Sequence, residues 1–235
     1  MISTKTRSEE REIMDDFSLE GAHLRENLDI LATINKWLGG NHISLNGVKK
    51  LITNESRQQK IKIVDLGCGN GDMLRRISKL GDKLGYEFEL IGVDANKDTI
   101  NYATELSVGF ENIAYLQLNI FSEEFKDFDY DIALLTLFLH HLSNEEIIEN
   151  LSLIKDKATL GIVVNDLQRS KIAYFLFSII SVFFNNKIVR NDGLVSILRA
   201  FKRNELENFA KLLKIKSEIG WRWAFRFQWV MYTKI

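Results

Sequence analysis

Three glycines at alternate positions form the group most suited to chemistry in this 235-residue chain. The apolar segment 61–66 predicts a strand, and Gly67, Gly69 and Gly71 follow it before a helix predicted over 72–80. Glycine tolerates positive φ and lets a ligand approach the main chain, and the helix N-terminus would face that ligand. The arrangement therefore predicts a nucleotide-type binding site.

The spacing of these glycines narrows the choice of nucleotide. A dinucleotide fingerprint, G-x-G-x-x-G, would place its third glycine at position 72, where this chain has Asp72. In addition, Asp65 at the end of the first strand would meet a pyrophosphate with like charge. A cationic ligand without phosphate fits better, so a nicotinamide oxidoreductase is a distant third alternative.

The segment 65–71 resembles the first motif of the class I S-adenosylmethionine-dependent methyltransferases, and three further segments follow in the family's order. The resemblance implies S-adenosylmethionine as the cofactor. The second segment, 89–94, is an apolar strand that ends in Asp94, 25 residues beyond Gly69. A carboxylate there can accept both ribose hydroxyls.

The third segment, 113–121, carries Asn119 at the position of the family's adenine-contacting residue, where many relatives have Asp. Its side-chain oxygen can accept from an adenine amino group, while Ile120 would cover a face of the ring. The competing interpretation is an Asn that only forms a turn. Altogether the resemblance assigns cofactor binding to Asp65, Gly67, Cys68, Gly69, Gly71, Asp94, Ala95, Asn119, Ile120 and Thr136.

The fourth segment, 128–136, predicts a buried parallel strand, and His140 and His141 follow its carboxyl end. Open α/β sheets bind ligands at that end, so both histidines are candidates for the base that deprotonates an acceptor. The alternative is that both are structural. No metal site is predicted, because the loop offers no acid to join Asp166, although His140, His141 and Asp166 could chelate a softer metal.

Composition limits the substrate class and the compartment. The net charge of −1 gives no basic footprint for nucleic acid, and without proline the chain cannot carry the N/D-P-P-Y/F/W signature of nucleic-acid amino methyltransferases. The only cysteine, Cys68, excludes an intrachain disulfide and is interpreted as small and apolar. The N-terminus lacks a signal-peptide core and no segment is long enough to span a membrane, so a cytoplasmic protein is expected.

The predicted fold is α/β, with a Rossmann-like seven-stranded sheet that ends in an antiparallel hairpin. An N-terminal helical extension, 1–55, precedes a methyltransferase domain, 56–235. The expected additions are helices over 18–38 and 44–53, a helix over 144–157 opened by a capping box at 143–146, a strand over 160–166, a helix capped by Asn204, and a hairpin over 215–232 that turns at Gly220.

An apolar insertion at about 168–200 contains a predicted helix over 170–185. The helix could be a lid over an apolar substrate or a buried core helix. Both interpretations predict that its apolar side chains are buried. Peripheral contact with lipid is a third possibility, weakened because the segment 172–184 lacks a cationic face.

The flanks narrow the resemblance further. The motifs at 14–16, 34–35, 166–169 and 191–193, with Ser196, resemble a bacterial small-molecule group associated with type III polyketide synthases and aromatic lipids. This implies a phenolic, polyketide or quinone-like acceptor methylated on oxygen or carbon, with Asp166 and Arg169 beside the pocket. A noncatalytic S-adenosylmethionine-binding regulatory protein is the alternative, and a homodimer is possible.

Overall fold

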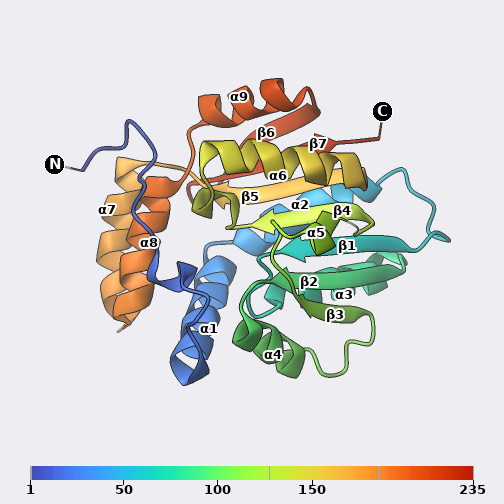
Figure 1. Ribbon diagram of the computed structural model, residues 1–235, viewed down its shortest axis with the longest axis horizontal. Helices are drawn as coiled ribbons and strands as arrows, with labels where there is room; N and C mark the ends of the chain where they lie inside the picture. The colour runs from blue at the N-terminus through green and yellow to red at the C-terminus, as the bar shows by residue number, and fades with distance from the viewer. Residues whose placement is uncertain (1, 127, 185, 235) are drawn as a thin grey trace.

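The computed structural model describes residues 2–126, 128–184 and 186–234, and within them seven strands form one mixed sheet (Figure 1). The strand order is β3-β2-β1-β4-β5-β7-β6. The first five strands pair in parallel, whereas β7 runs antiparallel to both β5 and β6. This confirms the predicted Rossmann-like sheet with a C-terminal antiparallel hairpin.

The strands are β1 (Ile61–Leu66), β2 (Phe88–Asp94), β3 (Ile113–Gln117), β4 (Tyr130–Thr136), β5 (Ala158–Leu167), β6 (Lys216–Arg222) and β7 (Arg226–Tyr232). The α-helices are α1 (Gly21–Trp37), α2 (Gly40–Ile52), α3 (Asp72–Leu84), α4 (Lys97–Leu106), α5 (Glu123–Lys126), α6 (Asn144–Lys157), α7 (Lys171–Ile180), α8 (Lys187–Arg199) and α9 (Arg203–Leu213). Short 3₁₀ helices are η1 (Ile13–Asp15), η2 (Leu139–His141) and η3 (Ser181–Phe184).

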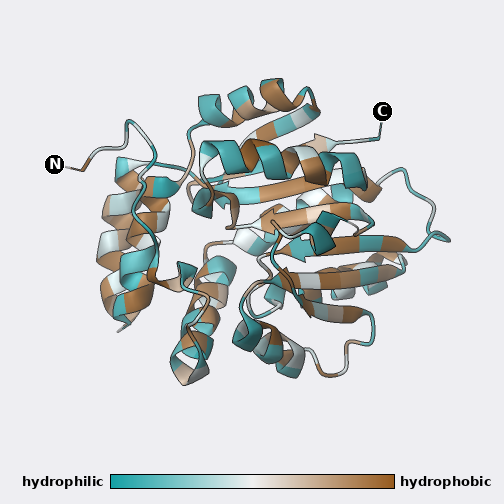
Figure 2. Ribbon diagram, viewed as in Figure 1, coloured by the Kyte–Doolittle hydropathy of each residue, from teal (hydrophilic) through white to brown (hydrophobic). Residues whose placement is uncertain are grey.

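Each face of the sheet carries its own apolar cluster, because successive side chains of a strand point to opposite faces. In β1, Ile61 and Ile63 pack with α2 and α3, whereas Val64 and Leu66 belong to the cluster that includes α6 and α9. The sheet is therefore a buried layer between helices (Figure 2). This packing holds the carboxyl ends of β1, β2 and β4 at one edge.

Most helix boundaries agree with the predictions to within a few residues. Gly39, at φ +74°, separates α1 from α2, and the predicted capping box at Ser143 and Glu146 opens α6. The predicted cap of α9 is wrong. Lys202, not Asn204, precedes the helix, because the Glu205 carboxylate accepts a hydrogen bond from the Lys202 backbone and fixes the start there.

The predicted turn of the C-terminal hairpin is also wrong. Gly220 lies inside β6, paired with Gln228, and the turn is at 223–225. In β7, the polar residues Arg226 and Gln228 are buried along with the apolar positions. The reason is that β7 is an interior strand between β5 and β6.

The apolar insertion differs most from the expectations. The predicted helix 170–185 forms α7 and η3, and its last residue lies outside the described residues. Ala173 is buried, but most of the large apolar side chains of α7 and η3 are exposed. The expected burial of this segment is therefore wrong. A second helix, α8, which the sequence analysis did not identify, covers the inner side of α7. Across the described part of the chain, no helix has the length and apolar character to cross a membrane.

Candidate active site

The loop between β1 and α3 contributes to the wall of a cavity of about 560 Å³. Gly67, Gly69 and Gly71 have φ values of +70°, +52° and +76°. A Cβ on Gly67 would overlap the Phe138 ring, and a Cβ on Gly71 would overlap the Tyr115 hydroxyl. Packing of the protein's own aromatic rings therefore requires two of the glycines, while Gly69 lines the cavity.

Two carboxylates stand at the ends of neighbouring strands, Asp65 on β1 and Asp94 on β2, and both line the cavity. Asp65 is 2% exposed, and its Oδ1 has no hydrogen-bond partner among the described residues. Burial, with a smaller effect of Asp94, raises the pKa of Asp65 to about 8. Asp94 accepts backbone N–H groups of Gly69 at 3.3 Å and Asn96 at 3.0 Å. Both retain free acceptor capacity toward the cavity.

Residues of the loop after β3 also line the cavity. Asn119 lines the cavity, but its Oδ1 accepts the Phe121 backbone N–H at 3.0 Å, so it does form the turn that the competing interpretation required. Ile120 is buried beside it, and Ala95 lines the cavity from the end of β2. Burial raises the pKa of the Cys68 thiol, which keeps it a neutral apolar group.

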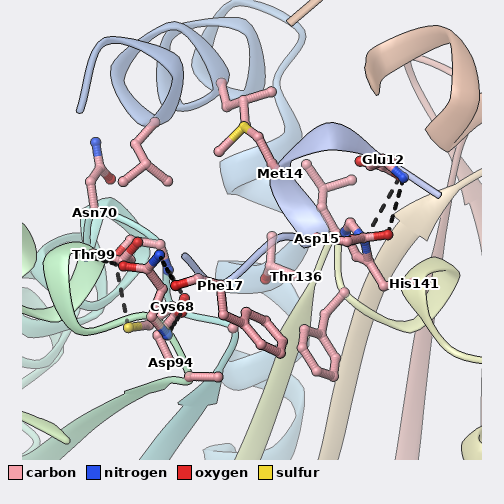
Figure 3. Close-up of a pocket in the computed structure, with 18 of the residues that line it drawn as sticks. Glu12, Met14, Asp15, Phe17, Cys68, Asn70, Asp94, Thr99, Thr136 and His141 are labelled. Atoms are coloured by element: carbon pink, nitrogen blue, oxygen red, sulfur yellow. Dashed lines mark hydrogen bonds and ion pairs between the residues drawn. The ribbon is translucent and has the colours of Figure 1, made fainter. Parts of the chain in front are cut away.

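Thr136, at the end of β4, lies between the glycine loop and the histidines and also lines the cavity (Figure 3). Its hydroxyl is 2.9 Å from the Ser44 hydroxyl, which in turn accepts from Asn165 Nδ2 at 3.0 Å. This chain of hydrogen bonds ties α2, β4 and β5 together beneath the cavity. These hydrogen bonds hold Thr136 in position at the surface of the cavity.

His140 and His141 are adjacent in the chain but occupy different environments. His140 is 2% exposed and is not one of the residues that line the cavity. Its Nδ1 lies 2.7 Å from Asp166 Oδ1, and its Nε2 lies 3.4 Å from Glu12 Oε1. Burial acts to lower the pKa of His140, but the two carboxylates outweigh burial and raise the pKa to about 10. His140 is therefore held as a buried cation at neutral pH, which makes it unsuited to accept a proton.

His141 lines the cavity, and its side chain is 26% exposed. Its Nδ1 lies 2.6 Å from Asp15 Oδ1, an interaction drawn in Figure 3. A carboxylate in this position holds the proton on Nδ1 and leaves Nε2 as an acceptor. Asp15 is itself fixed by Arg199, whose Nη1 is 3.2 Å from Asp15 Oδ2. The pair has the arrangement of a general base and the group that orients it.

One partner of each histidine, Glu12 for His140 and Asp15 for His141, comes from the first segment of the chain, here called the N-terminal strap (residues 2–20). Backbone groups hold part of the strap, since the N–H groups of Ile13 and Met14 each donate to an oxygen of Asp192 at 2.9 Å. Further along, Asn96 Nδ2 donates to the Phe17 carbonyl at 3.0 Å. Met14 and Phe17 themselves line the cavity (Figure 3). The strap thus forms the wall opposite the glycine loop.

A family model described as a methyltransferase domain matches residues 57–189, more than half of the chain. The chain belongs to this methyltransferase family. Similar solved structures include the plantazolicin methyltransferase BpumL in complex with SAH, at 18% identity and TM-score 0.66, covering 87% of this chain and 88% of that chain. Magnesium protoporphyrin IX methyltransferase (ChlM) from Synechocystis PCC 6803 is 13% identical at TM-score 0.55, with coverages of 85% and 86%. The CurJ carbon methyltransferase is 12% identical at TM-score 0.60, with coverages of 80% and 52%.

The protein is therefore a class I S-adenosylmethionine-dependent methyltransferase, with S-adenosylmethionine as its cofactor. The cavity of the methyltransferase fits this molecule chemically. The unpaired, buried carboxyl of Asp65 suits a cationic ammonium group, and Asp94 has acceptor capacity for hydroxyls. A nicotinamide cofactor has no support from these features.

Three potential metal-ligand atoms of the methyltransferase, one each from Glu12, His140 and His141, lie within 4.8 Å of one another. Burial acts to raise the pKa of Glu12, but hydrogen bonding and charge from the histidines outweigh it and lower the pKa. The sequence suggested Asp166 as the acid of such a site, but Asp166 lies on the other side of the His140 ring, at Nδ1. These atoms could hold a divalent cation only if it displaced the proton from His140. The expectation of no metal site stays a prediction.

Two residues expected beside the pocket lie elsewhere in the methyltransferase. Asp166 is 1% exposed, and its two oxygens accept the ring Nδ1–H and the backbone N–H of His140. Arg169 is buried in an ion pair with Glu205, with Nη2 2.6 Å from Oε1. Neither belongs to the residues that line the cavity, so that expectation is wrong. Both instead support the loop and helix behind it.

Sequence reasoning missed Glu12 and Phe17, and it gave Asp15 no chemical role. Asp15 and His141 are 126 positions apart, so no local spacing could have joined them. The available signal was the resemblance at 14–16, which marked the region without explaining it. The contact between Asp15 and His141 follows only from the folded position of the N-terminal strap.

Proposed function

We propose that the methyltransferase acts on a small-molecule acceptor of phenolic, polyketide or quinone-like type, on oxygen or carbon. One observation carries this proposal: a single cavity is lined by Asp65 and Asp94 on one side and by His141 and Asp15 on the other. Its volume of about 560 Å³ falls in the range of small-molecule sites, about 300–1,000 Å³. The polyketide-type resemblance in the flanking motifs supports the same class of acceptor.

His141 is the group proposed to take the acceptor's proton. Asp15 holds its Nδ1–H, so Nε2 can accept a proton from a hydroxyl or an activated carbon. Met14, Phe17 and Phe138 line the same space and exclude water from it. S-adenosylmethionine, when bound, supplies the electrophilic methyl group. Positioning of the acceptor against that group accounts for most of the acceleration.

The test is methyl transfer from labelled S-adenosylmethionine to a panel of phenols, polyketide phenols and quinols. We expect transfer by the wild type, and a loss of about 10²–10⁴-fold in turnover for His141→Gln with cofactor affinity retained. His42→Gln, at an exposed position of α2, is the matched control and should behave as wild type. Tight cofactor binding without transfer to any member of the panel would instead support the noncatalytic regulatory alternative.

The remaining expectations need other measurements. We propose the division into an N-terminal extension, 1–55, and a methyltransferase domain, 56–235, although α2 from the extension packs into the core cluster with α3. Deletion of 1–55 would therefore lower stability as well as activity. A cytoplasmic location and a homodimer stay predictions, to be tested by cell fractionation and light scattering.

A further inference from the structure

The outward side of α7 and η3 is apolar and exposed. Its members are Ile172 (63% exposed), Phe175 (62%), Leu176 (39%), Ile179 (49%), Ile180 (46%), Val182 (57%) and Phe183 (83%), here called the apolar face. Positions 172, 175, 176, 179 and 183 follow the spacing of one helix face. With seven large side chains about half exposed, this surface is on the order of several hundred Å², at or above the largest patch of a typical monomer.

The inner side of α7 is already packed. Ala173 is buried, and the Phe177 ring occupies the space that a Cβ on Gly193 of α8 would need. Gly193 also lines the cavity, together with Val189 and Ser196 of α8. In Figure 1, α7 forms the outer edge of the molecule, with α8 between it and the rest of the chain. The apolar face is therefore surface that folding of α7 onto α8 leaves uncovered.

The charged residues of the segment 171–191, which contains the apolar face, are all of one sign. Lys171 begins α7, and Lys187 and Arg190 lie in the first part of α8, all three exposed. The sequence 171–191 contains no Asp or Glu. The next acid, Asp192, is 3% exposed and holds the N-terminal strap. In a chain with a net charge of −1, this segment alone carries +3.

We propose that the apolar face docks on the surface of an anionic lipid bilayer. Apolar side chains would enter the boundary between headgroups and acyl chains, while Lys171, Lys187 and Arg190 meet the negative headgroups. A second copy of this chain fits less well, because a symmetric contact would bring six cations to one interface. The cationic residues missing from 172–184 are thus supplied by the start of α7 and by α8.

Docking would place the cavity close to the lipid. Because α7 lies between the apolar face and Gly193, which lines the cavity, the two are about one helix diameter apart, roughly 10 Å. A lipophilic acceptor could then reach the cavity without crossing much water. The inference goes beyond the proposed function, since lipid binding can be measured without any acceptor.

The test is co-sedimentation of the full chain with vesicles of phosphatidylglycerol and phosphatidylcholine, compared with phosphatidylcholine alone. We expect binding to the anionic vesicles that weakens with salt. The double change Phe175→Glu and Phe183→Glu should reduce partitioning by about 100-fold, roughly tenfold for each ring. Val108→Glu and Leu212→Glu, at exposed apolar positions of other elements, form the matched control and should bind like wild type.

A second variant separates charge from apolar contact. Replacing Lys171, Lys187 and Arg190 with Gln should weaken binding to anionic vesicles by about 100-fold at low salt, near fivefold for each charge. Retained S-adenosylhomocysteine binding shows that every variant is folded. Absence of wild-type binding to anionic vesicles, or equal loss in the Val108 and Leu212 control, would overturn the proposal. So would a lipid-free dimer that the Phe175 and Phe183 changes dissociate, because a second copy would then be the occupant.

Discussion

Asp65→Asn tests whether the buried carboxyl of Asp65 lowers the stability of the fold while it strengthens cofactor binding. The pKa of Asp65 is about 8 in the fold, against a usual value of 3.8. At pH 7 the folded protein therefore takes up a proton that the unfolded chain has released, which costs roughly 4 kcal/mol over three pKa units. Asn removes this cost but leaves an amide unpaired, at about 1–3 kcal/mol. We expect a net gain of about 1–3 kcal/mol in the free energy of unfolding.

The gain should depend on pH with a definite sign. Because the folded pKa is raised, the contribution of Asp65 to stability is fully present below pH 3.8 and is lost progressively up to about pH 8. The advantage of Asn over Asp should therefore grow between pH 5 and pH 8 and then stay constant. Urea unfolding of the cofactor-free protein at pH 5, 7 and 8.5 measures it. Asp82→Asn, at an exposed position of α3, is the matched control and should show no such trend.

Cofactor binding should change in the opposite direction. Asp65 can ionise beside a bound ammonium group, whereas Asn cannot, so the change should weaken the affinity for S-adenosylmethionine by roughly 10–100-fold, or about 1.5–3 kcal/mol. Calorimetric titration of wild type and Asp65→Asn gives both dissociation constants. An Asn variant with wild-type affinity would refute the assignment of Asp65 to the cofactor. A variant whose stability follows the wild type at every pH would refute the buried, unpaired carboxyl.

Three further substitutions test other parts of the site. Asp94→Ala should raise the dissociation constant for S-adenosylmethionine by about 10–100-fold in calorimetry with the fold intact; an unchanged constant would contradict its assignment to ribose. Asp15→Asn should lower turnover in the labelled-methyl assay while leaving cofactor affinity unchanged, since it removes the carboxylate that orients His141; wild-type turnover would leave positioning as the whole explanation. Gly71→Ala should destabilise the protein by about 1–3 kcal/mol in urea unfolding, with partial recovery on adding Tyr115→Phe, because the new Cβ would overlap the Tyr115 hydroxyl at φ +76°. No recovery would show that backbone strain alone sets the cost.

The sheet and the cavity residues at the ends of β1 and β2 were predictable because local sequence patterns indicate them. A buried parallel strand is a short apolar run that ends at polar residues, so 61–71 and 89–94 reveal two neighbouring strand ends directly. The parallel arrangement then brings Asp65 and Asp94 to one edge. The physical reason for the glycines was only partly predictable, since Phe138 and Tyr115 reach Gly67 and Gly71 from distant segments.

The side of the cavity formed by His141 and Asp15 was not predictable in the same way. The choice between His140 and His141 depends on which ring faces Asp166 and which faces the cavity, and adjacent histidines carry no signal for this. The outward orientation of the apolar face was hidden for a related reason. A segment apolar on all sides does not show which side a neighbouring helix covers, and α8 was not identified from the sequence.

At Met14 and Phe17 of the N-terminal strap, the backbone forms the attachment and the side chain lines the cavity. The side chains of Arg7 and Asp15 hold part of the strap, but at Ile13, Met14 and Phe17 the hydrogen bonds come from backbone groups. The side chains of Met14 and Phe17 therefore carry none of this attachment. Natural variation or a mutant library at these two positions could reshape the pocket while the strap stays in place. Acceptor preference could then diverge among relatives without a matching change in cofactor affinity.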